Sequence, residues 1–129
     1  MIEPYGVGWI ASTGGEALVQ CGQHGNVLRR LHTGLRRDHL MDFAFNVDRS
    51  RLYVLSSSLY GRDGLRRVSL SGGPSRLVKA KICGESLGVG RTAFVVGRAS
   101  AIDVRGPRTA ALRRTQQFSS DVLEVVVTP

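Results

Sequence analysis

Apolar and polar positions alternate over short distances along this chain, and glycine interrupts the pattern repeatedly. Short alternating runs bounded by Gly-rich turns are typical of antiparallel strands. We therefore expect an all-β fold. The pattern predicts about eleven strands: Val7–Ala11, Ala17–Cys21, Val27–Leu31, Met41–Phe45, Leu52–Leu55, Leu65–Leu70, Ser75–Val78, Thr92–Val96, Ala101–Val104, Ala110–Arg114 and Val122–Val127.

One short stretch could depart from the β pattern. A short helical turn could form at Arg37–Met41, because Leu35, His39, Asp42 and Phe43 would share one face of a helix in this stretch. Gly34 before it and the β-type run Phe43-Ala44-Phe45 after it oppose a longer helix.

The strand pattern repeats. The tripeptide Leu-Arg-Arg begins at Leu28, Leu35, Leu65 and Leu112; the copy at Leu35 lies between two predicted strands, and the copy at Leu112 falls one strand late. The strand and Gly-turn pattern is therefore the better marker of the repeat. It divides a single domain, residues 1–129, into approximate units 7–45, 46–90 and 91–129. Units of this size cannot bury their apolar faces alone, so we expect three four-stranded, blade-like antiparallel units that stack.

Residues 42–78 carry a resemblance to a known family. The segment from Asp42 to Val54 is an apolar strand, a polar turn and a second strand containing Leu52-Tyr53, and Gly64–Val78 adds two strands around a Gly turn. This arrangement resembles one blade of the YWTD, NHL and TolB-like β-propellers. No Trp-Thr-Asp follows Tyr53, where Val54-Leu55-Ser56 stand instead.

The resemblance implies a propeller with too few blades. Propellers close with about four to eight four-stranded blades. Three open blades would expose sheet edges and apolar surface, which soluble proteins avoid. The chain could be a piece of a longer protein or a β-sandwich that looks blade-like. The interpretation that we favour is a partial propeller completed by protein partners, either other copies of itself or a larger complex. Two copies would form one six-bladed ring.

Composition fits a globular protein, with 42% hydrophobic and 22% charged residues. The net charge is +8, with 16 arginines and 2 lysines. Such a charge favours nucleic acid or acidic partners, but a GC-rich coding sequence would also produce it. No apolar run is long enough to cross a membrane and no secretory signal is visible, so we expect a cytoplasmic protein without a membrane partner. Cys21 and Cys83 are expected to be reduced thiols, buried or half-buried.

Candidate catalytic and metal motifs are weak. Cys21 and His24 have Cys-x-x-His spacing, but His32 and His39 are not spaced as a second zinc pair. Gly84-Glu85-Ser86-Leu87-Gly88 satisfies the nucleophile-elbow pattern, yet no helix is expected after it, so a Gly-rich loop is the better interpretation. We expect no catalytic, cofactor-binding or metal-binding residue and no enzyme. A propeller-type hydrolase or lactonase is the remaining catalytic alternative.

Paired arginines are the candidate binding residues. Neighbouring residues on a strand point to opposite faces, so stacked units could align one arginine each into a positive stripe. Arginine binds phosphate or carboxylate as a two-pronged donor. The sequence predicts a non-catalytic interaction or assembly module; the alternative is a basic RNA-associated subunit. The candidate residues for an anionic partner are Arg29, Arg30, Arg36, Arg37, Arg66, Arg67, Arg113 and Arg114.

Overall fold

The computed structural model describes residues 1–13, 17–35, 39–57 and 64–128, and in this part of the chain it contains strands but no helix. Each group of four consecutive strands forms one antiparallel sheet, in chain order. Sheet 1 consists of β1 (Ile2–Tyr5), β2 (Gly8–Thr13), β3 (Ala17–Cys21) and β4 (Val27–Leu31). Sheet 2 consists of β5 (His39–Phe45), β6 (Leu52–Ser57), β7 (Gly64–Val68) and β8 (Arg76–Ala80). Sheet 3 consists of β9 (Ser86–Val89), β10 (Phe94–Arg98), β11 (Ala101–Arg105) and β12 (Leu112–Gln117).

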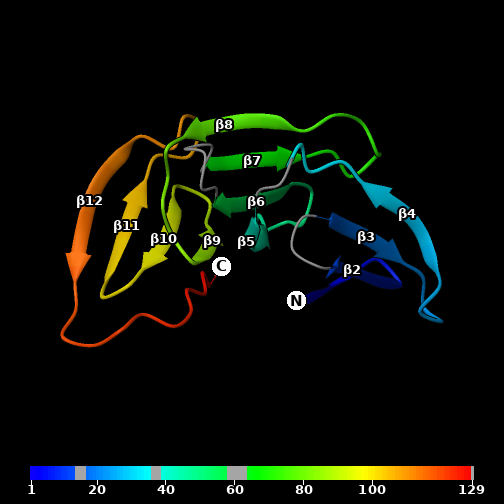
Figure 1. Cartoon of the computed structure of the whole chain (residues 1–129), viewed down its shortest axis with the longest axis horizontal. Helices are drawn as coiled ribbons and strands as arrows, with labels where there is room; N and C mark the ends of the chain where they lie inside the picture. The colour runs from blue at the N-terminus through cyan, green and yellow to red at the C-terminus, as the bar shows by residue number, and fades with distance from the viewer. Residues whose placement is uncertain (14–16, 36–38, 58–63, 129) are drawn as a thin grey trace.

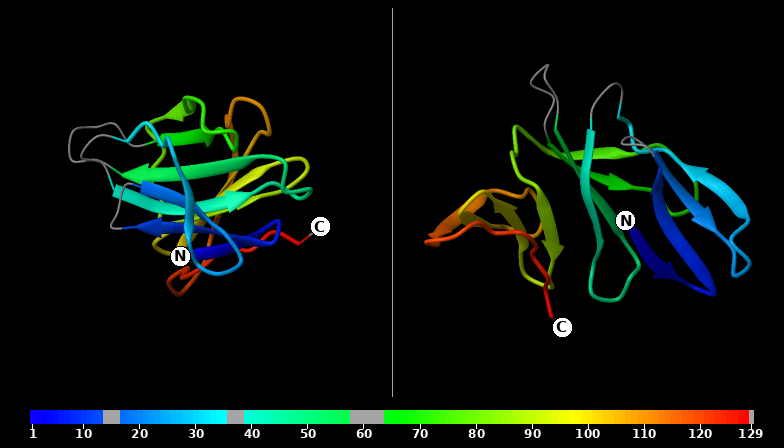
Figure 2. Two further views of the ribbon diagram at one scale, coloured as in Figure 1. Left: turned by 90° about the vertical axis from the view of Figure 1, so that its right-hand side faces the viewer. Right: turned by 60° about the horizontal axis from the view of Figure 1, so that its bottom comes forward.

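The three sheets spread like a fan (Figure 1). The inner strands β5 and β9 lie near the centre, close to both chain termini, and β4, β8 and β12 form the rim. Figure 2 shows the sheets as separate layers placed side by side, with sheet 2 between the other two. Among the described residues, no strand pairs sheet 3 with sheet 1. The expected all-β fold of three four-stranded units is therefore confirmed, and the arrangement is open, as in part of a propeller.

Sheet 2 is buried on both faces because β6 alternates between two cores. Leu52 and Val54 face sheet 1, whereas Tyr53 and Leu55 face sheet 3. The core between sheets 1 and 2 contains Ile10, Leu18, Leu31, Leu40, Phe43, Leu52, Val54 and Val68. The core between sheets 2 and 3 contains Tyr53, Leu55, Leu65, Ile82, Leu87, Val89, Phe94, Val96 and Ala110. Sheets 1 and 3 consequently bury one face each against sheet 2 and turn the other face outward.

Two strands and the sheet boundaries differ from the sequence prediction. The structure adds β1, and it places Ser86 in β9, so the Gly-rich loop expected at Gly84–Gly88 is wrong in part. Met41 lies in β5, not in a helical turn, and residues 36–38 lie outside the described residues. In the structure, sheet 2 begins with β5 and sheet 3 begins with β9. The repeat units expected from the sequence assign the residues of β5 to the end of unit 7–45 and those of β9 to the end of unit 46–90. The polar turn after Phe45 joins two strands of one sheet and does not separate two sheets.

The predicted strand Val122–Val127 is wrong: residues 118–128 form a tail without strand pairing. Phe118 N donates to Ser100 O at 2.7 Å and Val122 N to Ala99 O at 2.6 Å, which fixes the start of the tail. The valines that follow pack on the outer face of sheet 3, where two glycines leave room. A Cβ at Gly88 would lie 2.5 Å from Val127 Cγ2, and a Cβ at Gly97 would lie 2.8 Å from Val125 Cγ2.

Candidate interaction surfaces

The outer face of sheet 1 carries an apolar row. Strand register places Ile2 beside Ala11 and Ala11 beside Val19, and it places Trp9 beside Cys21 and Cys21 beside Val27. These residues occupy the face opposite the buried Ile10 and Leu18 because side chains alternate along a strand. We call them the sheet 1 outer face: Ile2, Trp9, Ala11, Val19, Cys21 and Val27.

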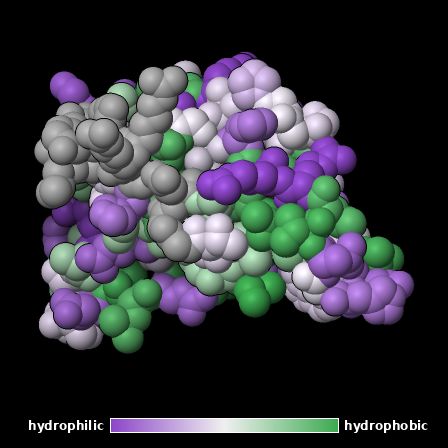
Figure 3. All heavy atoms as spheres, turned by 45° about the vertical axis from the view of Figure 1, so that its right-hand side comes forward, coloured by the Kyte–Doolittle hydropathy of each residue, from purple (hydrophilic) through white to green (hydrophobic). Residues whose placement is uncertain are grey.

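This face is open to solvent. Trp9 is 38% exposed and Val27 is 64% exposed. Figure 3, in which the right-hand side of Figure 1 comes forward, shows hydrophobic surface among hydrophilic side chains. Contiguous exposed apolar surface of this kind is typical of interaction sites. The corresponding face of sheet 3 differs because the tail covers its glycines.

Exposed apolar side chains lie mainly at the two ends of the fan. Of the large hydrophobic residues that are exposed in the described chain, only Leu77 belongs to sheet 2. On the tail, Leu123 is 90% exposed and Val126 is also exposed, since they point away from sheet 3. The members at sheet 1 are Met1, Ile2, Val7, Trp9, Val27 and Leu28, and those at sheet 3 and the tail are Leu112, Phe118, Leu123 and Val126.

The arginine pairs of sheets 1 and 2 partly converge. Arg29 Nη1 donates to Leu70 O at 3.3 Å and so reaches from β4 to sheet 2. Arg30 and Arg66 line a cleft of about 650 Å³ between the end of β4 and the β7–β8 turn. Arg36 and Arg37 lie outside the described residues.

The other predicted arginines lie apart from that cleft. Arg67 is paired with Arg76 across β7 and β8. Arg113 Nη1 donates to Thr92 O at 3.0 Å, and Arg114 lies opposite Val104 on the outer face of sheet 3. The described arginine pairs therefore do not form one continuous stripe. Arg30 and Arg66 share a cleft, whereas Arg113 contacts the β9–β10 turn.

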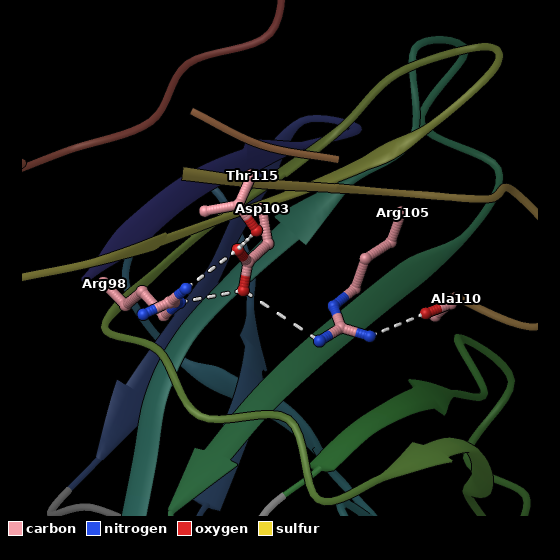
Figure 4. A network of polar contacts seen from close by, with 5 residues as sticks. All are labelled: Arg98, Asp103, Arg105, Ala110 and Thr115. Atoms are coloured by element: carbon pink, nitrogen blue, oxygen red, sulfur yellow. Dashed lines mark hydrogen bonds and ion pairs between the residues drawn. The ribbon is translucent and has the colours of Figure 1, made fainter. Parts of the chain in front are cut away.

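Sheet 3 contains a polar network in which two other arginines share one carboxylate (Figure 4). Asp103 is almost fully buried and accepts hydrogen bonds from Arg98 Nε at 2.9 Å and Thr115 Oγ1 at 2.7 Å. Arg105 Nη2 lies 4.0 Å from the same carboxylate, and Arg105 Nη1 donates to Ala110 O. Burial alone would raise the pKa of Asp103, but the hydrogen bonds from Arg98 and Thr115 and the two positive charges outweigh it and lower the pKa.

Acidic side chains gather near the centre of the fan. Glu3, Asp42 and Glu124 line a cleft of about 320 Å³ among the inner strands and the tail. Asp42 Oδ2 accepts from Leu87 N at 2.8 Å and so joins β5 to β9. Burial raises the pKa of Asp42, and the charges of Glu124 and Glu3 add to the rise, against the hydrogen bonds from Leu87 and Phe43. Burial and the neighbouring carboxylates therefore make ionisation of Asp42 less favourable than in a free carboxyl group.

Sequence reasoning missed three arginines that line a cleft of about 490 Å³ between sheets 2 and 3. Arg51 precedes β6, Arg91 lies in the β9–β10 turn, and Arg108 lies in the β11–β12 turn. Within the described chain, no ion pair joins any of them to a carboxylate. A usable signal was present, because each arginine follows Ser, Gly or Pro at a hairpin turn.

The weak chemical motifs do not assemble into a site in the described part of the chain. No group of three or more His, Cys, Asp and Glu side chains there could hold a metal ion. Ser86 is buried, and its Oγ has no hydrogen-bond partner, so no base is positioned to activate it. Cys21 is half-buried, as expected, whereas the expected burial is wrong for Cys83, which is exposed because it lies in the connection between β8 and β9. The described residues include no helix that is long and apolar enough to cross a membrane.

Comparison with known proteins adds no family to this description. No protein-family model matches the chain. A search of curated proteins finds no significant match. The resemblance of residues 42–78 to YWTD, NHL and TolB-like blades stays a prediction that rests on the residues quoted for it.

Proposed function

We propose that this protein is a non-catalytic assembly module that completes its fold by pairing with a second copy of itself. The observation that carries the proposal is the concentration of exposed apolar side chains at sheet 1 and at sheet 3 with its tail, while both faces of sheet 2 are buried. Blade-like units stabilise one another by stacking. The two end units of the fan each lack one neighbour.

The second copy would supply both missing neighbours. The sheet 1 outer face of each protomer would pack on sheet 3 and the tail of the other. Leu123 and Val126 of one protomer would then meet the apolar row that includes Trp9 and Val27 of the other. The contact would be made twice, related by a two-fold axis, which closes the assembly and prevents open filaments. Six sheets around one centre would result.

Light scattering coupled to size-exclusion chromatography tests the proposal. At micromolar concentration the mass should be twice the 14.0 kDa of the chain. Trp9→Glu and Leu123→Glu place a charge in each half of the contact, and both should yield monomers because burying an unpaired charge is costly. Leu77→Glu is the matched control, since Leu77 is an exposed leucine on β8 away from both surfaces.

Three outcomes would count against the proposal. A wild-type monomer would refute self-association. Equal effects of Trp9→Glu and Leu77→Glu would show that the sheet 1 outer face is not the contact. A dimer that persists in Leu123→Glu but is lost in Trp9→Glu would show that two sheet 1 outer faces pair directly and that no closed ring forms.

A further inference from the structure

The cleft lined by Arg51, Arg91 and Arg108 has the features of an anion-binding site, and we call it the arginine cleft. Its floor is rigid, because Tyr53 and Phe94 are both buried and their rings meet edge to face at 4.9 Å between centroids. Its volume of about 490 Å³ lies in the range of small-ligand pockets. Its arginines come from three hairpin turns of two sheets, so the packing of sheets 2 and 3 holds them together.

The charge of the cleft is unbalanced. Asp48 is the only carboxylate among its described lining residues. Asp48 accepts hydrogen bonds from both the backbone N and the Oγ of Ser50. The Ser50 side chain and backbone, followed by weaker effects that include the charge of Arg51, lower the pKa of Asp48, so it stays ionised as part of the turn. The cleft is therefore lined by three exposed arginines and by one carboxylate that is already engaged.

Other arginines of the same chain show what is missing here. Arg49 lies 3.8 Å from Glu3 and stacks over the Phe45 ring, and Arg98 and Arg105 share Asp103. In the described residues, the three arginines of the arginine cleft have no such carboxylate partner. An anion supplied from solution would take that place.

The positive field extends beyond the cleft. Arg51 also lines a neighbouring hollow of about 450 Å³ that contains Arg67 and Arg76. A guanidinium presents paired donors that fit two oxygens of a phosphate group. Three such groups spread around one cleft, with two more beside it, fit several linked phosphate groups better than a single one.

We propose that the arginine cleft binds a compact ligand that carries two or more linked phosphate groups, either as free polyphosphate or as a nucleoside polyphosphate. Arg51, Arg91 and Arg108 bind the phosphate oxygens. The buried rings of Tyr53 and Phe94 form the floor beneath them and hold the cleft in shape. The site is independent of self-association, because neither the sheet 1 outer face nor the tail lines it.

Isothermal titration calorimetry of the full chain tests the inference, with sodium tripolyphosphate as the first probe and ATP as the second. Both should bind saturably with one site per chain. Tighter binding of ATP would assign the ligand as a nucleotide, and equal binding would assign it as the phosphate chain itself. Citrate should bind much more weakly, because its three carboxylates do not present the tetrahedral oxygens of phosphate.

Substitutions separate a built site from a diffuse positive field. Arg51→Gln, Arg91→Gln and Arg108→Gln should each weaken tripolyphosphate binding about tenfold or more, as expected for the loss of one charge-assisted hydrogen bond. Arg114→Gln removes the same charge from the rim strand β12 and should leave the affinity within about twofold. Circular dichroism checks that each variant remains folded, and Trp9→Glu checks that binding persists in a monomer.

The inference is overturned if neither phosphate probe binds, if citrate binds as tightly, or if Arg114→Gln weakens binding as much as the cleft variants do. Binding of a single-stranded RNA oligonucleotide that the three cleft substitutions weaken and that tripolyphosphate does not displace would also overturn it. That result would instead favour the RNA-associated alternative. Failure here would leave the dimer untouched, since the two experiments probe different surfaces.

Discussion

Asp103→Ala should be among the most destabilising polar substitutions in this chain. Asp103 is almost fully buried and is the shared partner of Arg98, Arg105 and Thr115 (Figure 4). The side chain of Arg105 is only 12% exposed, and its Nε has no hydrogen-bond partner even in the wild type. Removing Asp103 would leave this guanidinium buried without a counter-charge.

The magnitude follows from which partner is buried. Breaking a buried ion pair by removing one member costs about 3–5 kcal/mol, because the other charge stays desolvated. Arg98→Ala removes a half-exposed arginine but leaves the buried Asp103 carboxylate, which keeps only the hydrogen bond from Thr115 and the charge of Arg105. It should therefore cost about 1–3 kcal/mol, less than Asp103→Ala. The double variant Asp103→Ala with Arg105→Leu should recover most of the loss, because it removes both buried charges.

Urea unfolding followed by circular dichroism measures these free energies, at one fixed protein concentration so that any dimerisation affects all variants equally. Asp103→Ala should destabilise the protein most, and Arg98→Ala and the double variant should each cost less. Equal costs for Asp103→Ala and Arg98→Ala would refute the reasoning, since the burial of Arg105 would then carry no penalty. A double variant as unstable as Asp103→Ala would refute it as well.

Two further predictions concern Asp103 and the tail. The pKa of Asp103 is lowered in the folded state, so the stabilisation by its carboxylate is present above the ordinary pKa of about 4 and is lost as the pH falls through the lowered value. Between pH 7 and pH 3 the wild type should therefore lose more unfolding free energy than Asp103→Asn. Equal losses would contradict this assignment. Gly88→Val should displace the tail, because its side chain would occupy the space of Val127 and Val125. Thermolysin should then cleave residues 118–128 several-fold faster than in the wild type or in the control Gly73→Val, and unchanged cleavage would show that the tail does not depend on this contact.

Strong alternation made most of the fold predictable from the sequence. β6 and β7 follow from Leu52–Leu55 and Leu65–Leu70, whose residues divide between the two cores as their alternation predicts. β1 was not predicted because Glu3 and Pro4 weaken the β pattern, although proline is tolerated in an edge strand.

The remaining errors arise from long-range packing. Ser86–Val89 resembles a loop because it contains glycine, yet these residues form strand β9. Gly88 is part of this strand, and a side chain there would collide with Val127 of the tail. The tail resembles a strand because it is rich in valine, yet those valines pack on a glycine-lined sheet face without strand pairing.

The arginines show the same limit. The sequence drew attention to adjacent pairs such as Arg29 and Arg30, but the structure gathers Arg51, Arg91 and Arg108 from separate turns. Their proximity depends on how sheet 3 packs on sheet 2, which no local pattern encodes. The recurrence of arginine at hairpin turns was the one signal available in the sequence.

Fluorescence of Trp9 tests the central claim, burial of the sheet 1 outer face by a second copy, most directly. Trp9 is the only tryptophan of the chain and lies on that face, so its emission reports the environment of the face alone. On dilution from micromolar to nanomolar concentration, the emission maximum should move to longer wavelength as the dimer dissociates and water reaches the indole, while Leu77→Glu follows the same curve. An emission maximum that stays at the position of an exposed tryptophan at every concentration would contradict the account.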